Sequence, residues 1–442
     1  MEKTHQITKS RIFLIVILLP TIIFGQENIS TNLAKYMQSQ VEINNFSGTV
    51  IVTKNDSILL KKAYGLADYE WNIKNTIDTK YQLASVTKQF TATAILQLVE
   101  KGKLSLNDKL SQFFPDYPKA DRVTIHMLLS HCSGLAMGFK EIATSSMSAD
   151  SAYNEIKKMP YEFSPGTKTA YSNIGYYLLA KILEKVSGEK YADYLNIHIF
   201  KKVGMKNSGV ITNEILIPKK AKNYILEDNK YINNPYINWK INIGHDGVYS
   251  TVEDLALWDK ALYGTTILSE KMKKLMFTSY NSENWGYGFI INPFYNHGHQ
   301  LIAHDGGFFG AMTSLNRFID DSLFVTVLSN NESFSYIIAY GLSAIVLQMP
   351  VELPYKHYQT KIDNSIYDKY TGKYGEIEII KIGEKLYYNN SETELLPESQ
   401  TKFFRANNND RTIEFIKDKT GIYNSIILTK GGVKEIVMKN NQ

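Results

Sequence analysis

The sequence is poor in cysteine and in proline, with one cysteine and 11 prolines among 442 residues. A single cysteine excludes an intramolecular disulfide, so the fold must be held by its core and its hydrogen bonds. A chain of this length has room for such a core, in one large domain or two ordinary ones. We interpret Cys132 as a buried, inert residue rather than a nucleophile, although His131 precedes it.

The sequence also lacks an excess of charge of one sign. Lysine and arginine total 49, and aspartate and glutamate total 44, which gives a formal net charge of +5. The two signs are interspersed and form no basic stripe, so the sequence does not favour a nucleic-acid partner. The hydrophobic content of 44% and the charged content of 21% are those of an ordinary folded protein.

Long apolar runs are missing except near the N-terminus. There, Lys3, Lys9 and Arg11 precede an apolar run that ends in a small residue, Gly25, and is short for a membrane span. This pattern predicts a signal peptide over residues 1–25 and an exported protein, periplasmic or extracellular. An uncleaved N-terminal anchor is the alternative. We expect no membrane span after cleavage of the signal.

A polar pair precedes a segment that is apolar on nearly every side, residues 91–101. This segment predicts a helix buried all round. Ser85 and Lys88 are three residues apart at its start, so their side chains share one face. A desolvated lysine loses its charge more readily and can then accept a serine proton. Ser85 and Lys88 are therefore a candidate nucleophile and base, although Ser187 and Ser399 begin the same Ser-x-x-Lys pattern.

The order of the expected elements indicates an α+β fold. The patterns predict a helix (31–41), a hairpin (46–65), the buried helix (85–102), a largely helical middle (107–263), four strands (within 285–329) and a closing helix (334–348). Within the middle, residues 224–242 are predicted as a loop. The order predicts one domain over residues 26–349, with its sheet assembled from both ends of the chain.

A break bracketed by Pro350 and Pro354 follows this domain. We place a linker at residues 350–366. Residues 367–442 contain short alternating segments, which predict a separate, small all-β module.

Three short motifs follow one another along the chain: Ser85-Val86-Thr87-Lys88, Tyr171-Ser172-Asn173 and His304-Asp305-Gly306-Gly307. Supporting phrases lie at residues 128–135, 163–166, 203–205 and 247–251. As an ordered set they resemble the serine β-lactamase and penicillin-binding-protein superfamily, specifically its class C-like branch, over about residues 31–349. The resemblance implies a β-lactamase-like antiparallel sheet flanked by helices, with a helical subdomain. The tail from Tyr367 is similar to a small β-barrel module that is often appended to such hydrolases.

The resemblance also implies a role for each motif residue. The nucleophile, the proton shuttle and the general base would be Ser85, Lys88 and Tyr171. The substrate would be bound by Asn173, His304 and Gly306. The oxyanion hole would be formed by the backbone N–H groups of Ser85 and Gly307. A packed core tyrosine is the alternative interpretation of Tyr171.

His304 departs from the family pattern, because true β-lactamases of this type usually carry lysine there. Histidine is common among the peptidases and esterase-like members, which weakens the case for antibiotic hydrolysis. An unperturbed histidine titrates near pH 6.5, so we expect a substrate carboxylate to bind better as the pH falls through that value. The alternatives are a core histidine hydrogen-bonded within the sheet and a metal site shared with His297 and His299. No acidic ligand with suitable spacing accompanies these histidines.

The sequence therefore predicts an exported serine hydrolase that forms an acyl-enzyme on an amide, a lactam or an ester, with a small molecule or a short peptide as substrate. We expect no metal and no cofactor, and the oligomeric state is left open. The alternatives are a carboxylesterase of the same fold and a non-catalytic penicillin- or peptide-binding sensor. The presence of Ser85, Lys88 and Tyr171 argues against the sensor.

Overall fold

The structure is a computed structural model and describes residues 23–228, 230–389, 393–405 and 408–440. The predicted signal peptide lies almost entirely at residues 1–22, outside this part. Helix α1 (Ile23–Asn44) is the first described element. None of the helices among the described residues is both long enough and apolar enough to cross a bilayer.

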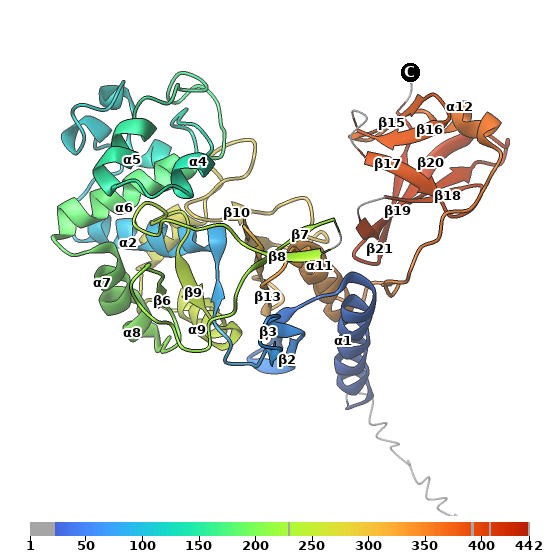
Figure 1. Ribbon diagram of the computed structural model, residues 1–442, viewed down its shortest axis with the longest axis horizontal. Helices are drawn as coiled ribbons and strands as arrows, with labels where there is room; N and C mark the ends of the chain where they lie inside the picture. The colour runs from blue at the N-terminus through green and yellow to red at the C-terminus, as the bar shows by residue number, and fades with distance from the viewer. Residues whose placement is uncertain (1–22, 229, 390–392, 406–407, 441–442) are drawn as a thin grey trace, which may run out of the picture.

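An antiparallel sheet lies at the centre of the molecule, and the described residues contribute six strands to it in the order β10-β11-β12-β13-β1-β2. The early hairpin therefore pairs with the strands that follow the helical middle, as predicted (Figure 1). The strands are β1 (Gly48–Lys54), β2 (Ser57–Tyr64), β10 (Ile290–Ile291), β11 (Leu301–Phe308), β12 (Ala311–Phe318) and β13 (Leu323–Ser329). Of the strand expected at residues 285–291, only the last two residues form one.

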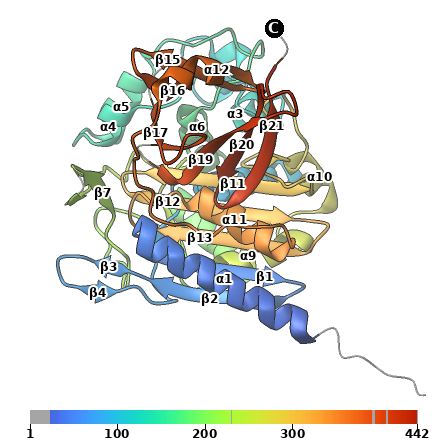
Figure 2. The same ribbon diagram turned by 90° about the vertical axis from the view of Figure 1, so that its right-hand side faces the viewer.

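Helices cover both faces of this sheet. On one face α1 packs beside α11 (Ser335–Val346), and Figure 2 shows both crossing in front of the strands. On the other face lie α9 (Val252–Tyr263) and the central helix α2 (Lys88–Glu100). Because side chains alternate along a strand, Val50 and Val52 join the core under α1 and α11, whereas Ile51 joins the core around α2.

The central helix α2 is buried along almost its whole length, as its composition predicts. Its residues from Lys88 to Leu98 are all buried, and Gly102 follows it with a left-handed φ of 69°. A helical subdomain surrounds α2. Its helices are α3 (Ile125–Leu129), α4 (Lys140–Ala143), α5 (Ala149–Ile156), α6 (Asn173–Ser187), α7 (Tyr191–Leu195), α8 (Lys201–Val203) and α10 (Glu270–Met276).

The predicted loop at residues 224–242 is wrong in its first part, because β7 (Tyr224–Glu227) and β8 (Lys230–Asn233) pair as a hairpin. Among these residues only Tyr224 is buried, so the apolar alternation that identifies a strand is nearly absent. The remaining short strands are β3 (Leu66–Asp68), β4 (Ile73–Lys74), β5 (Tyr81–Gln82), β6 (Gly209–Val210) and β9 (Val248–Ser250).

The C-terminal part is an all-β module, as predicted. After α12 (Tyr367–Tyr370), its described residues form eight consecutive antiparallel strands. They are β14 (Gly372–Tyr374), β15 (Ile377–Ile382), β16 (Lys385–Tyr388), β17 (Thr393–Pro397), β18 (Lys402–Arg405), β19 (Asn408–Lys417), β20 (Tyr423–Lys430) and β21 (Val433–Met438). The sheet curls until the Asn440 N–H donates to the Lys373 carbonyl oxygen at 2.8 Å, which makes a near-barrel. The module has its own core, in which the rings of Tyr370 and Phe415 stack at 4.1 Å.

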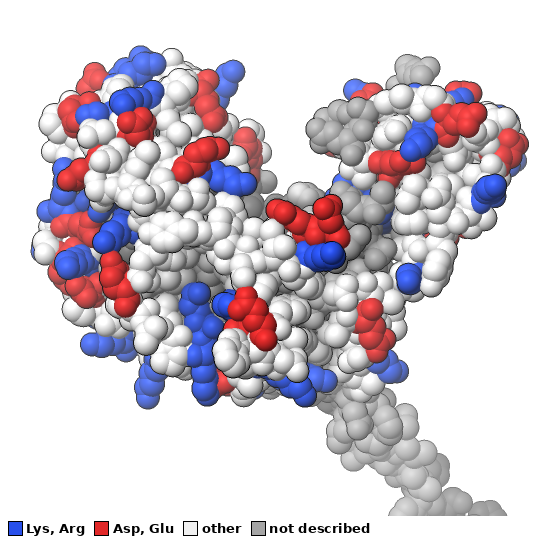
Figure 3. All heavy atoms as spheres, viewed as in Figure 1, with Lys and Arg blue, Asp and Glu red and all other residues white. Residues whose placement is uncertain are grey.

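The surface carries both signs of charge. On the face shown in Figure 3, lysine and arginine side chains are intermingled with carboxylates over the helical part and over the C-terminal module. This mixture agrees with the interspersed charges of the sequence and does not indicate a nucleic-acid-binding surface.

Candidate active site

The three sequence motifs lie together beside the N-terminal end of α2. Ser85 lies on the short helix η1 (Ala84–Thr87), Tyr171 in the loop before α6, and His304 on β11. The Lys88 Nζ donates to the Asn173 Oδ1 at 2.7 Å, and the rings of Tyr171 and His304 are 6.2 Å apart. The fold thus brings together residues that are more than 200 positions apart along the chain.

The turn that carries Ser85 is held rigidly. Ala84 has a φ of +48°, a left-handed conformation that costs a non-glycine residue about 1–3 kcal/mol and is typical of functional sites. The Leu83 N–H donates to the Val248 carbonyl oxygen, and the Leu83 carbonyl oxygen accepts from the Thr313 hydroxyl, each at 2.8 Å. These bonds attach the turn to β9 and β12, and the Ser85 that it carries is half-buried.

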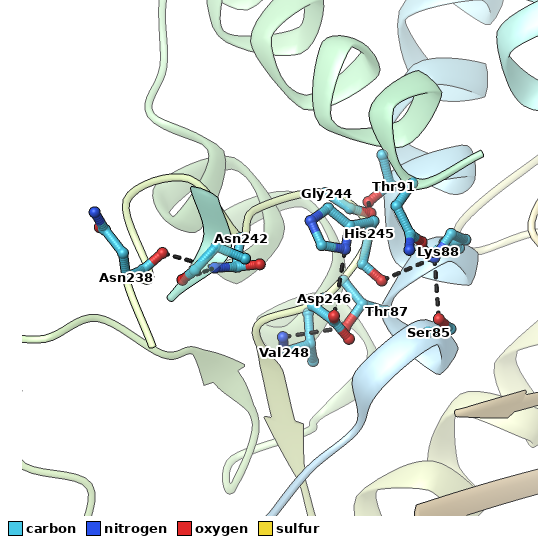
Figure 4. A network of polar contacts seen from close by, with 12 residues as sticks. Ser85, Thr87, Lys88, Thr91, Asn238, Asn242, Gly244, His245, Asp246 and Val248 are labelled. Carbon is cyan, nitrogen blue, oxygen red and sulfur yellow. Dashed lines mark hydrogen bonds and ion pairs between the residues drawn. The ribbon is translucent and has the colours of Figure 1, made fainter. Parts of the chain in front are cut away.

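Lys88 is fully buried and donates three hydrogen bonds, of which Figure 4 shows those to Ser85 and to the His245 carbonyl oxygen. Its Nζ lies 3.1 Å from the Ser85 Oγ, 2.7 Å from the Asn173 Oδ1 and 3.1 Å from the His245 carbonyl oxygen. Burial lowers the pKa of Lys88 to about 7, although the charge of Asp246 opposes this shift. A substantial fraction of Lys88 is therefore neutral at neutral pH and able to accept the Ser85 proton.

Tyr171 contacts both Lys88 and Ser85. Its ring lies 4.6 Å from the ring of His131 and 5.2 Å from that of Trp285, and the Lys88 Nζ lies 4.7 Å from its centroid. Burial raises the pKa of Tyr171 well above its ordinary value, and hydrogen bonding to Ser85 offsets this only in part. The phenol is therefore protonated at neutral pH, which makes it a proton donor rather than the ready base that the family resemblance implies.

Strand β11 packs directly against the turn that carries Ser85. A Cβ atom at Gly306 would lie 2.5 Å from the Leu83 carbonyl oxygen, so only glycine permits this approach. Residues 304–308 pair with β12 on one side, while β10 reaches no further than residue 303 on the other. The arrangement is compatible with an oxyanion hole between the Ser85 and Gly307 N–H groups, which stays a prediction.

His304 is buried, and the expectation that it titrates near pH 6.5 is wrong. Burial and then the charge of Lys88 lower the pKa of His304 to about 3. Its Nδ1 lies 2.6 Å from the carbonyl oxygen of Asp305, and its buried Nε2 has no hydrogen-bond partner. At neutral pH His304 is therefore uncharged, and it can offer a substrate only a neutral ring nitrogen.

The three histidines considered as metal ligands have separate partners. His297 contacts the carbonyl oxygen of Tyr340 at 3.1 Å, and His299 lies 2.7 Å from Asp321. Across the described residues, no three histidine, cysteine or acidic side chains are grouped closely enough to hold a metal ion.

His131 positions Tyr171, a role that the sequence did not reveal. Its Nδ1 accepts from the Ser172 N–H at 3.1 Å, directly beside Tyr171. Burial, followed by the charges of Lys88 and His304, lowers the pKa of His131 well below its usual range, so it stays neutral. Its neighbour Cys132 is half-buried rather than buried as predicted, with its Sγ 3.7 Å from the Thr169 hydroxyl.

A cavity of about 940 Å³ opens beside these groups and is lined by Asn173 and Gly307. It is also lined by Ile225 and Ile232 of the β7–β8 hairpin, the element that sequence patterns missed. His245 also lines it, and the neighbouring Asp246 is buried within electrostatic reach of Lys88. The Gly-His-Asp-Gly sequence at residues 244–247 was the available signal for both residues.

Comparison with known proteins agrees with this arrangement. Penicillin-binding protein 4* of Bacillus subtilis (strain 168) is 30% identical over 421 residues, which cover 86% of this chain and 92% of that protein. Teichoic acid D-alanine hydrolase of Staphylococcus aureus is 25% identical over 67% of this chain and 72% of that protein. The octameric penicillin-binding protein homologue from Pyrococcus abyssi superposes with a TM-score of 0.67 at 26% identity, covering 92% of this chain and 99% of that one. The family model described as Beta-lactamase matches residues 33–342, most of the sequence, and the chain therefore belongs to the β-lactamase family.

Proposed function

We propose that the chain is an exported serine hydrolase that forms an acyl-enzyme on Ser85 and hydrolyses an amide, a lactam or an ester. One observation carries this proposal. A buried lysine with a pKa of about 7 lies 3.1 Å from the hydroxyl of a half-buried serine that is fixed in a strained turn. Poorly solvated lysines of this kind activate nucleophiles, whereas a lysine kept only for structure is charged and paired.

Acylation would follow from the protonation states of the free site. Neutral Lys88 accepts the Ser85 proton as the Ser85 Oγ attacks the substrate carbonyl carbon. The backbone N–H groups of Ser85 and Gly307 would donate to the developing oxyanion. The protonated phenol of Tyr171 would give its proton to the leaving group, and Lys88 would then restore the phenol. Asn173 accepts from Lys88 through its Oδ1, which leaves its Nδ2 to donate to the substrate.

Hydrolysis of the acyl-enzyme would reverse these roles. A water molecule takes the place of the leaving group, and neutral Lys88 would accept its proton as the water oxygen attacks the acyl carbon. Ser85 leaves with a proton returned by Lys88. Because each proton passes between groups already present, the cycle balances without a cofactor.

The relatives support a hydrolase but name different substrates. One is named for hydrolysis of D-alanine from teichoic acid, and others are named for binding penicillin. The proposed substrate class therefore includes D-amino-acid amides and esters as well as lactams. Neutral His304 favours the amide and ester members, because it lacks the cation that holds a lactam carboxylate.

The proposal is tested with the purified mature protein on three substrate types: nitrophenyl esters, D-amino-acid peptides and a chromogenic cephalosporin. We expect turnover of an ester or a peptide, and a mass increase on the peptide that contains Ser85. Turnover of esters alone would favour the carboxylesterase. Acylation without turnover would favour the penicillin- or peptide-binding sensor. If no substrate is turned over and none acylates the protein, the proposal is refuted.

A second test concerns His304 and pH. Since its pKa is about 3, we expect the KM for a carboxylate-bearing peptide to change by less than about twofold between pH 5.5 and 8. A neutral ester measured in parallel controls for other titrations. If the KM of the charged substrate alone falls several-fold as the pH falls through 6.5, His304 does become charged in the complex.

A third test concerns the C-terminal module. A chain that ends at Met349 retains every residue placed in the site, so we expect it to hydrolyse small esters at a reduced rate. We also expect a lower Tm, because truncation uncovers Tyr36, which donates to the Gly431 carbonyl oxygen. Circular dichroism and thermal unfolding, measured with the rate, separate the two effects. A truncated chain that is normally folded yet inactive would mean that the module supplies part of the site.

A further inference from the structure

A second cavity lies between the C-terminal module and the catalytic domain. Its volume is about 580 Å³, within the range of small-molecule sites. The module contributes strands β18, β19 and β20, and the catalytic domain contributes aromatic residues that include Phe294, Tyr295 and Tyr340. None of its lining residues belongs to the cavity beside Ser85, so the two sites are separate.

Three cations line this cavity: Arg405 of β18, Arg411 of β19 and Lys430 of β20. The structure pairs none of them with a carboxylate of a described residue, since its ion pairs in the module involve other lysines and His357. The two acids that line the cavity, Glu376 and Glu435, are exposed.

The three cations repel one another and keep unused donors. Burial, followed by the charge of Arg411, lowers the pKa of Lys430 to about 8, although the charges of Asp305 and Glu435 partly oppose this shift. Burial and the charge of Arg411 also lower the pKa of Arg405. The Nε atoms of Arg405 and Arg411 are buried and have no hydrogen-bond partner. An unpaired buried donor costs more on a charged group than on a neutral one, so the cluster gains from an anion.

Aromatic rings compensate for only part of this cost. The Lys430 Nζ lies 4.2 Å from the ring centroid of Phe294, and the Arg405 guanidinium lies 4.8 Å from that of Tyr388. Such contacts stabilise a cation, but they accept no hydrogen bond from the guanidinium edge. Arg411 gives one N–H to the Tyr336 hydroxyl and keeps its Nε free.

We propose that this cavity binds an organic phosphate, with the phosphate held by Arg405, Arg411 and Lys430 and the organic part between the aromatic side chains. Two guanidinium groups and an ammonium match the terminal oxygens of a phosphate monoester, which carries close to two negative charges. The rings of Tyr340 and Phe294 and the side chains of Ile413 and Leu428 supply the apolar wall for the organic part. The ligand is therefore an amphiphilic phosphate, either a soluble ester or the headgroup of a lipid.

Binding is measured with the full chain and two probes. Phenyl phosphate, in calorimetric titration, represents the soluble ester, and vesicles of phosphatidylcholine with phosphatidic acid represent the headgroup. We expect one probe to bind, and Arg411→Met and Arg405→Met each to weaken that binding tenfold or more. Lys419→Met removes an exposed cation of the same module and should leave it unchanged. The proposal is overturned if neither probe binds, or if Lys419→Met weakens binding of the probe as much as the two arginine variants do.

Hydrogen exchange on the unsubstituted protein locates the site without relying on a variant that folds. With the probe that binds, we expect slower exchange in the segments 402–417 and 423–430. Slower exchange only around Ser85 and β11 would place the probe in the catalytic cleft and overturn the proposal.

Discussion

Replacement of Ser85 by alanine is expected to lower kcat/KM by roughly 10³-fold or more, because it removes the only atom proposed to form the acyl bond. The side chain is half-buried and accepts a hydrogen bond from Lys88 at 3.1 Å, so the loss of one hydroxyl leaves the core intact. The variant should also fail to form the adduct that a fluorophosphonate or a labelled penicillin forms with the unsubstituted protein. Initial rates and intact-protein mass spectrometry measure the two effects.

Ser187→Ala is the matched control. Ser187 begins the same Ser-x-x-Lys pattern, but its hydroxyl donates to the Leu183 carbonyl oxygen at the end of α6, and it lines neither of the two cavities described above. We expect this variant to keep its rate and its labelling. The assignment of Ser85 as the nucleophile would be contradicted by an adduct that maps to Ser187 or to Ser399. An undiminished rate in the Ser85→Ala enzyme would contradict it as well.

The central helix and the sheet could be predicted because their buried positions carry mostly apolar residues. In α2, every position from Lys88 to Leu98 is buried, so the segment is apolar on nearly all sides, which is typical of a core helix. Strand β13 is buried on both faces and is a nearly continuous apolar run. The order of the motifs then placed Ser85, Tyr171 and His304 in one site.

The features that could not be predicted are those that depend on contacts with segments distant in the sequence. The β7–β8 hairpin has few buried side chains, so its sequence carries no strand period, although it forms a wall of the cleft. The pKa of His304 depends on its burial and on Lys88, two facts that its own sequence context does not contain. Asp246 likewise gains its influence on Lys88 only once the chain is folded.

The protonation state of Lys88 is expected to set the pH dependence of catalysis. Activity requires the neutral amine, and the pKa of Lys88 is about 7, so kcat/KM should rise with pH through 7 and level off near pH 8. At pH 5 only about one lysine in a hundred is neutral, which predicts a fall of about 100-fold relative to the plateau. Two of the groups that face Lys88 do not reproduce this curve, because burial raises the pKa of Tyr171 well above its ordinary value and lowers that of His304 to about 3.

Lys88→Met tests this origin directly. Methionine fills the buried space without a basic nitrogen, and we expect kcat/KM at pH 8 to fall by roughly 10²–10⁴-fold, the usual contribution of a general base. The rate that remains should no longer rise through pH 7. Lys190→Met, which removes the exposed lysine of the second Ser-x-x-Lys pattern, should retain both the rate and the pH profile. If the Lys88→Met enzyme keeps the inflection near pH 7, another group is the base, and His245, whose ring is buried beside Asp246, becomes the first candidate.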